Sequence, residues 1–571
     1  MLGGWALNAF YLLVNDAGTI AQRSFGDPDN SMRLLEVRDW LAGQGWFDVS
    51  QHRLGDGLYP MHWSRLVDLP IAGAIVVLRP FIGGAQAEIA AAAIVPLLTL
   101  LVVIATVAAI TRRLAGIGVV AIAVVMVALC MPVQFQLKPL RIDHHGWQIA
   151  LALAAVLPLL GRPTMRNGAL AGLALATLLT VSLEGLPIAA AIMGVVALGW
   201  TVRPERASAL LGLAWAAFGA AAALHAVTRG PTFFSPACDA MAPAWIAVLG
   251  AAAVALTLAV RLSGGALMRL ASLAAAGAVA GAVLLWLAPQ CLAGPFGNLP
   301  PRVYRIWYLS VQEGRPLFEQ DASSQLALLA FPLAGLAGTA IAWRAARDEA
   351  RDRWSTMAAL LIAAVGISLF VLRAGATANA LAIPGAAVLA HAALVRARRV
   401  HPVLPRVLAT FGALMLMAPI HLGMAVLLPF HPAKKASAPR CVATDVRALG
   451  TLPAGTMFLP LDLAPELLVS TRHRAITGGY HRGAYWIDRL IVGFTAPPER
   501  ARAVIGALHA DYVASCADLP EAKLYARLAP GGLWGRLARG ERFAWLQPVP
   551  VNGRMKVWRV IHPLPEGPAR N

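Results

Sequence analysis

The chain has 571 residues, of which 58% are hydrophobic and only 13% charged, and its mean hydropathy is +0.65. About a quarter of the residues in soluble domains are charged, so this composition excludes a string of soluble domains and predicts a polytopic membrane protein. The net charge of +19 would suit nucleic acid, but the basic residues punctuate hydrophobic segments. We therefore interpret them as signals of membrane topology and expect no nucleic-acid partner.

Apolar runs long enough to cross a bilayer recur along the first 430 residues. We predict thirteen spans, near residues 1–14, 87–110, 115–132, 147–161, 168–182, 186–200, 207–226, 243–260, 270–288, 326–342, 356–372, 379–395 and 407–429. Residues 15–86 are predicted to form one long external loop. The apolar end of this loop, residues 69–83, is expected to lie along the membrane.

Arginines mark alternate connections between the predicted spans. They are Arg112 and Arg113; Arg162 and Arg166; Arg203 and Arg206; Arg261 and Arg269; Arg344, Arg347, Arg351 and Arg353; and Arg396, Arg398, Arg399 and Arg406. Short loops rich in arginine stay in the cytoplasm. The pattern therefore predicts a cytoplasmic N-terminus and an external region after residue 430.

Residues 431–571 have the polar content of a soluble domain, and short β-like runs alternate there with helical ones. We predict a small extracytoplasmic α/β domain. Cys441 and Cys516 lie in it, Cys238 and Cys291 lie in predicted external loops, and Cys130 lies in a span. Four cysteines in an oxidising compartment allow three pairings. We favour Cys238–Cys291 and Cys441–Cys516, each within one region, and four unpaired thiols are the alternative.

Acidic residues gather in three predicted external segments: 26–33 (GDPDNSMR), 141–147 (RIDHHGW) and 310–316 (SVQEGRP). Carboxylates with an imidazole suit Mn²⁺ or Mg²⁺, and arginine side chains suit a phosphate. Asp143 and His145 are two residues apart, so in an extended loop they would share a face. The alternatives are helix caps or turns for Asp27 and Asp143, and a solvated side chain for Glu313.

The order and spacing of these segments resemble the catalytic subunit of oligosaccharyltransferases, including the single-chain bacterial and archaeal forms, in the GT-C superfamily of membrane glycosyltransferases. Asp27 matches the first-loop aspartate of that family, Asp143-His144-His145 matches the archaeal second-loop motif, and Ser310-Val311-Gln312-Glu313 matches the late-loop Ser-Val-x-Glu. The resemblance implies thirteen spans, a long first loop and a C-terminal periplasmic domain, in a bacterial inner membrane.

The resemblance also implies site residues. Asp27, Asp143 and His145 would hold the metal; Asp27, Asp143 and Glu313 would be catalytic, with Glu313 orienting the acceptor or completing the metal shell. Arg373 would contact the donor phosphate, although an interfacial arginine extending towards water is the alternative. Residues near the expected site complete the set: Arg302, Arg305 and Arg315 for the phosphate, and Asp29, His144, Glu184, Tyr480, His481 and Arg482 for the surrounding chamber.

One family feature is absent. The Trp-Trp-Asp-Tyr-Gly signature, which recognises the Ser or Thr of an Asn-x-Ser/Thr acceptor, does not occur, and the nearest aromatic patch is residues 478–486 (GGYHRGAYW). In that patch Tyr480, His481 and Arg482 would line a groove or form an ordinary turn.

The sequence therefore predicts a metal-dependent, inverting glycosyltransferase that uses a polyprenyl-linked sugar donor and a glycan, lipid or protein acceptor. A polyprenyl-monophosphate-sugar transferase that modifies a lipid or polysaccharide is one alternative, and a lipid or glycan transporter is another. Transporters bury ionisable groups near the membrane midplane, whereas the acidic segments here lie in predicted loops.

Overall fold

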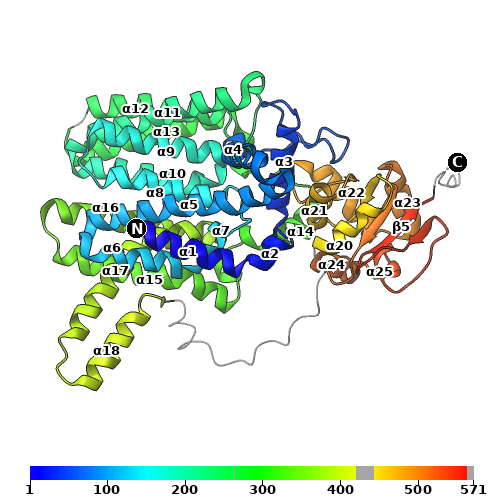
Figure 1. Cartoon of the computed structure of the whole chain (residues 1–571). Helices are drawn as coiled ribbons and strands as arrows, with labels where there is room; N and C mark the ends of the chain where they lie inside the picture. Colours follow the sequence, from blue (N-terminus) through cyan, green and yellow to red (C-terminus); the bar gives the residue numbers. More distant parts are fainter. Residues whose placement is uncertain (263, 420–440, 442, 562–571) are drawn as a thin grey trace.

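The computed structural model describes residues 1–262, 264–419, 441 and 443–561, and helices dominate this part of the chain (Figure 1). Up to residue 419 they are α1 (Leu2–Asn15), α2 (Ala17–Ala21), α3 (Pro28–Leu41), α4 (Arg65–Ile82), α5 (Gly84–Ala115), α6 (Val120–Leu129), α7 (Met131–Leu137), α8 (His145–Leu159), α9 (Met165–Val181), α10 (Leu186–Val202), α11 (Ala207–Arg229), α12 (Pro243–Arg261), α13 (Ala266–Leu287), α14 (Pro301–Ile306), α15 (Ala322–Ala345), α16 (Asp348–Phe370), α17 (Gly375–Arg398) and α18 (Val403–Met415).

Eight helical segments in the described residues are long and apolar enough to cross a membrane: Gly84–Ala115, Leu183–Val202, Pro204–Thr232, Pro243–Arg261, Ala266–Leu287, Ala322–Ala345, Asp348–Phe370 and Leu372–Arg398. Helices α6 and α7 add a ninth if the bend of 67° between them is one broken span. Helices α8, α9 and α18 are shorter apolar helices. The predicted polytopic membrane protein is confirmed, whereas the count of thirteen stays a prediction.

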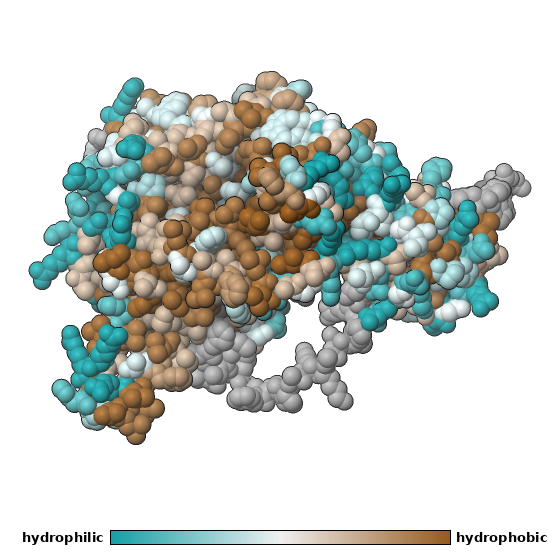
Figure 2. Space-filling model, in the orientation of Figure 1, coloured by the Kyte–Doolittle hydropathy of each residue, from teal (hydrophilic) through white to brown (hydrophobic). Residues whose placement is uncertain are grey.

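The last predicted span, 407–429, is described only to residue 419, and the predicted domain boundary at residue 430 lies outside the described residues. Each lipid-spanning segment is helical because a helix satisfies its own backbone hydrogen bonds where no water can. Figure 2 shows hydrophobic residues covering the side of the helical bundle in view.

Three of the six connections that carry the predicted cytoplasmic arginines contact one another. Arg206 pairs with Asp352, so the connection between α10 and α11 meets the start of α16. Arg269 donates to the carbonyl oxygen of Thr201, and this contact brings the start of α13 to the same place. These connections therefore lie at one end of the bundle, and the C-terminal region lies at the other (Figure 1).

The predicted first loop folds into α2, α3 and α4. Asp27 caps α3, with Pro28 at the first helical position, and Ser64 caps α4. Inside this loop the guanidinium of Arg33 donates to Asp68 at 2.8 Å and lies over the ring of Trp63. An apolar part of α4 faces outward, as a segment lying along a membrane would require.

After residue 443 the chain forms an α/β unit, as predicted. Its strands β1 (Thr456–Phe458), β2 (Arg474–Ala475), β3 (Tyr512–Ser515), β4 (Leu546–Val549) and β5 (Lys556–Val560) make a sheet of order β2-β1-β3-β5-β4. Strand β1 is parallel to β2 and β3, and β5 is antiparallel to β3 and β4. The helices of this unit are α20 (Ala443–Arg447), α21 (Ala464–Ser470), α22 (Ala484–Thr495), α23 (Pro498–Ala507), α24 (Pro520–Leu528) and α25 (Leu533–Ala538).

The first loop and the C-terminal unit share one hydrophobic core, in which residues of α3 and α4 pack with residues of α21 and β1. Polar contacts add to this core: the Tyr59 hydroxyl lies 2.9 Å from the Thr477 hydroxyl, and Arg38 donates to the carbonyl oxygen of Val469. The first loop is thus held between the membrane helices and the C-terminal unit.

The structure pairs Cys238 with Cys291 and Cys441 with Cys516, which are the favoured pairings. The first disulfide joins the connection between α11 and α12 to the segment after α13. Cys130 is a free, buried thiol between α6 and α7.

Candidate functional site

The three acidic segments meet at one guanidinium, although they are far apart in the sequence. Arg141 donates to Asp27 Oδ2 at 2.6 Å, its Nε lies 3.3 Å from Asp143 Oδ2, and its Nη2 lies 3.9 Å from Glu313 Oε1. We call these four residues the Arg141 cluster. Gln136 accepts from Arg141 Nε and Nη2, and the ring of Phe135 lies 4.6 Å below the guanidinium. Helix α7 therefore fixes the arginine.

Both aspartates of the Arg141 cluster also accept a local backbone hydrogen bond, as their alternative role in caps or turns predicts. Asp27 Oδ1 accepts from the backbone N–H of Asp29, and Asp143 Oδ1 accepts from the backbone N–H of His145. In each aspartate the second carboxylate oxygen, Oδ2, faces Arg141. Asp143 Oδ2 is buried and makes no hydrogen bond within the described residues.

Asn30 locks the first two acidic segments together. Its side-chain oxygen accepts from the backbone N–H groups of Ile142 and Asp143, at 2.8 and 3.1 Å. Asn30 is fully buried in the first turn of α3. The amide thereby sets the position of Asp143 relative to Asp27.

Histidines extend the site towards the next pair of helices. His145 Nδ1 lies 3.0 Å from Asp143 Oδ1, and the stacked ring of His144 places its Nε2 3.3 Å from Glu184 Oε2. His145 Nε2 is 3.8 Å from the same Glu184 oxygen, and Arg373 pairs with the other one. Glu184 therefore joins the predicted chamber to the predicted phosphate contact.

The charge balance around Arg141 is negative. Asp27, Asp143 and Glu313 share one arginine, and Asp29 lies close by. Burial and the nearby carboxylates of Asp27 and Asp143 raise the pKa of Asp29 well above its usual range. Crowded carboxylates beside the His145 imidazole, whose Nδ1 lies 3.0 Å from Asp143 Oδ1, fit a divalent cation with oxygen and nitrogen ligands.

Two of the other arginines predicted to contact the phosphate form ion pairs outside the Arg141 cluster. Arg302 pairs with Asp488 of α22 at 3.0 Å, and Arg315 pairs with Glu319 at 2.7 Å. Arg305 lies in the last turn of the short helix α14. Their part in phosphate binding stays a prediction, and Arg373 is the arginine that the structure places beside Glu184.

The aromatic patch of the C-terminal unit divides between two neighbourhoods. Tyr480 is buried edge-on against Trp63, with ring centroids 5.5 Å apart, and the carboxylates of Asp29 and Glu36, after burial itself, raise its pKa. His481 and Arg482 instead meet Asp239, from the connection between α11 and α12, at 2.7 Å.

Sequence reasoning missed the roles of Arg141, Asn30 and Asp239. Arg141 and Asn30 lie inside the acidic segments, so their proximity to the aspartate of the same segment was visible in the sequence. Their partners in the other segment, more than a hundred residues away, were not. Asp239 follows Cys238 directly, and the predicted disulfide was the signal that its loop is held in place.

No protein-family model and no curated protein matches the sequence. Among solved structures, the chain is similar to the archaeal oligosaccharyltransferase AglB from Archaeoglobus fulgidus. The complex of AglB with an inhibitory peptide and a dolichol-phosphate has a TM-score of 0.65 at 15% identity, over 96% of this chain and 72% of AglB. The apo form of the archaeal enzyme has a TM-score of 0.68 at 16% identity, over 93% of this chain and 71% of the archaeal chain. The complex of that enzyme with Zn and sulfate has a TM-score of 0.58 at 16% identity, over 89% of this chain and 66% of the archaeal chain. The likeness confirms the predicted fold class, a bundle of membrane helices with a small C-terminal α/β unit.

Proposed function

We propose that the chain is a membrane glycosyltransferase that moves a sugar or oligosaccharide from a polyprenyl-(pyro)phosphate donor to an acceptor on the external face. The observation that carries this proposal is the Arg141 cluster, which gathers the aspartates of the first two segments and the glutamate of the third around one point. A second support is the fold, which AglB shares and in which a dolichol-phosphate and an acceptor peptide have been found.

We assign Asp27, Asp143 and His145 as ligands of Mn²⁺ or Mg²⁺. When bound, such an ion stabilises the negative charge that develops on the leaving phosphate. Arg141 contacts the Oδ2 atoms of both aspartates, so it holds the two carboxylates close to one another. The archaeal complex with Zn and sulfate supports a metal and an oxyanion in this fold.

We assign the donor phosphate to the neighbourhood of Arg373. A guanidinium grips phosphate oxygens bidentately, and Arg373 is anchored by Glu184 beside both site histidines. The donor's lipid then has an adjacent path. Leu183 and Leu186, which flank Glu184, line an apolar cavity of about 320 Å³ between α9, α10, α11, α12 and α13. This volume lies in the range of ligand pockets, and its apolar lining suits a polyprenyl chain.

The acceptor approaches from the open side of the Arg141 cluster. The side chains of Asp27 and Glu313 are 24% and 42% exposed, whereas that of Asp143 is 1% exposed. The nucleophile forms a bond to the anomeric carbon as the bond from that carbon to the phosphate oxygen breaks, and its proton passes to an exposed carboxylate. A single displacement of this kind inverts the anomeric configuration.

The test is transfer by the purified full-length protein in lipid, with labelled polyprenyl-monophosphate and polyprenyl-pyrophosphate sugars as separate donors. Mass spectrometry then identifies the product among lipid, glycan and peptide acceptors. Because the family's acceptor signature is absent, a peptide with an Asn-x-Ser/Thr sequon is expected to be a poor acceptor. Absence of transfer from every lipid-linked donor, together with donor translocation across the bilayer, would favour a transporter instead.

A further inference from the structure

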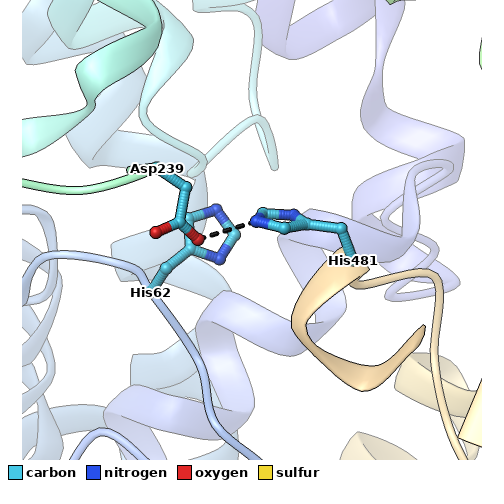
Figure 3. Close-up of side chains that lie close together, drawn as sticks. All are labelled: His62, Asp239 and His481. Atoms are coloured by element: carbon cyan, nitrogen blue, oxygen red, sulfur yellow. Dashed lines mark hydrogen bonds and ion pairs between the residues drawn. The ribbon is translucent and has the colours of Figure 1, made fainter. Parts of the chain in front are cut away.

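A second group of metal-ligating side chains lies at the junction of three segments. His62 comes from the end of the first loop, Asp239 from the connection between α11 and α12, and His481 from the C-terminal unit. Figure 3 shows the three side chains pointing towards one another. One ligand atom of each lies within 4.8 Å of the others, and His481 Nε2 is 2.7 Å from Asp239 Oδ2. We call these residues the His62 cluster.

The surroundings hold the His62 cluster in place. Arg229 donates to the backbone carbonyl of His62, and Arg482 donates to that of Met61, both at 3.1 Å. The disulfide at Cys238 fixes the residue before Asp239. The ring of Phe296 packs edge-on against His481, with centroids 5.1 Å apart. Ligands fixed in this way lose little freedom when an ion binds.

One ring nitrogen of His62 is buried without a hydrogen-bond partner among the described residues. This atom is Nδ1, and the ring centroid of His62 lies 4.8 Å from that of His481. A buried polar atom with no partner is costly, and native structures rarely leave one. His481 and Asp239 already contact each other, so a cation between the three groups would give His62 its missing partner.

We propose that His62, Asp239 and His481 bind Zn²⁺. Zinc takes imidazole nitrogen and carboxylate oxygen in tetrahedral sites, and three protein ligands leave the fourth position to water or a ligand. Zn–N distances near 2.0–2.1 Å place tetrahedral ligands about 3.3 Å apart, so binding requires a small movement of these side chains.

The ligand set favours zinc over the ions proposed for the Arg141 cluster. Arg482 donates to both oxygens of Asp239 at 2.7 Å, which orients the carboxylate and offsets its charge. Mg²⁺ and Mn²⁺ prefer several anionic oxygens, whereas two imidazoles suit zinc. The proposed ion would fasten the C-terminal unit to the first loop and to the α11–α12 connection, beyond any part in sugar transfer.

The experiment uses the full-length protein in detergent, without a polyhistidine tag, in an Asp143→Asn/His145→Ala background that removes the proposed catalytic metal site. Elemental analysis and competition with a zinc chelator measure bound Zn²⁺. We expect about one equivalent to remain in this background and at least tenfold weaker binding after His481→Ala or His62→Gln. His52→Ala, which removes an exposed histidine of the same loop, should keep the zinc.

Other results of the same experiment would overturn the zinc proposal. The proposal fails if the background binds no zinc, or if both histidine changes leave binding unchanged. Absence of zinc with a stable junction would mean that the cluster is an ion pair alone. If His481→Ala does not fold, Co²⁺ spectra of the folded background replace that arm, because tetrahedral nitrogen ligation gives intense visible absorption. A featureless Co²⁺ spectrum would overturn the proposal.

Discussion

The Arg141 cluster and the His62 cluster both place a carboxylate beside an arginine, but they differ in charge balance. Around Arg141, three carboxylates share one guanidinium, and Asp29 adds a fourth acid nearby. Around Asp239, one carboxylate serves both Arg482 and His481. Local charge therefore favours a hard cation with oxygen ligands at the first place and leaves nitrogen ligands to dominate at the second.

The largest expected effect is on the rate of transfer, and it distinguishes the Arg141 cluster from the His62 cluster. Asp27→Ala and Asp143→Ala should each lower the transfer rate at least about a hundredfold, because ~2.7 kcal/mol of lost transition-state stabilisation gives that factor. Initial rates with a labelled lipid-linked donor measure it. Asp56→Ala, at an exposed loop-one carboxylate, is the matched control and should keep the wild-type rate. Wild-type rates in both aspartate variants would remove the Arg141 cluster from catalysis.

Metal removal sharpens the same comparison. EDTA should reduce transfer as strongly as the aspartate changes do, and Mn²⁺ or Mg²⁺ added without zinc should restore it, because the catalytic ligands are rich in oxygen. The measurement is the initial rate after chelation, gel filtration and addition of one ion at a time. Recovery with Zn²⁺ alone would show that the charge balance does not select the ion.

A smaller loss is expected for Glu313→Gln. The amide keeps the shape of the side chain but loses the charge that faces Arg141, and Glu313 is the most distant carboxylate in the cluster, at 3.9 Å. We expect a fall of about tenfold in turnover, equivalent to ~1.4 kcal/mol, with metal affinity retained. Parallel rate and metal-binding titrations distinguish this outcome from loss of the ion.

At the other cluster the expected change is in stability. Asp239→Asn removes the negative partner of Arg482 and His481 at a largely buried place, where an unmatched polar group costs about 1–3 kcal/mol. The apparent melting temperature in EDTA should fall by a few degrees. Asp488→Asn, which breaks the more exposed pair with Arg302, should change it less. Equal shifts in the two variants would mean that burial at the junction adds nothing.

The smallest expected effect concerns pH, and it tests the interior of the C-terminal unit rather than the junction of that unit with the first loop. Burial, and next the charge of Asp462, raise the pKa of Glu521 from 4.5 to about 8. The pKa of Glu521 is higher in the folded state than in the unfolded state. Its contribution to the free energy of unfolding is therefore fully present at low pH and is lost as the pH rises through about 8. Between pH 6 and 8.5 the melting temperature of the wild type should fall by a few degrees more than that of Glu521→Gln. Parallel curves would contradict the raised pKa.

The membrane helices were the predictable part of the fold. The apolar run 87–110 becomes α5, Gly84–Ala115, because lipid demands a helix whatever its neighbours are. The helix α3 was not predicted. Arg33 and Glu36 are buried on it, which breaks the usual pattern of one apolar face, and the compensating Asp68 lies on α4. Such pairing depends on tertiary structure and leaves no local signal.

The candidate site was predictable by residue type but not by partner. Asp143 and His145 are close in sequence, so their proximity followed from spacing alone. Arg141 and Asp27 are 114 positions apart, and apolar helix faces in lipid are nearly interchangeable, so the sequence does not state which loops meet. Asp239 was missed for the same reason, since both of its partners lie more than 240 residues further along the chain.

The contact between Ser31 and Glu466 spans 435 positions, and this separation has a consequence for biosynthesis. Ribosomes add roughly 5–20 residues per second, so the first loop waits roughly 20–90 s for the segment that covers it. During that interval the buried face of α3 is open to water, to chaperones and to proteases. In a newly made chain the contact that covers α3 therefore forms only after Glu466 has been made, and a defect in the C-terminal unit would expose the first loop to degradation.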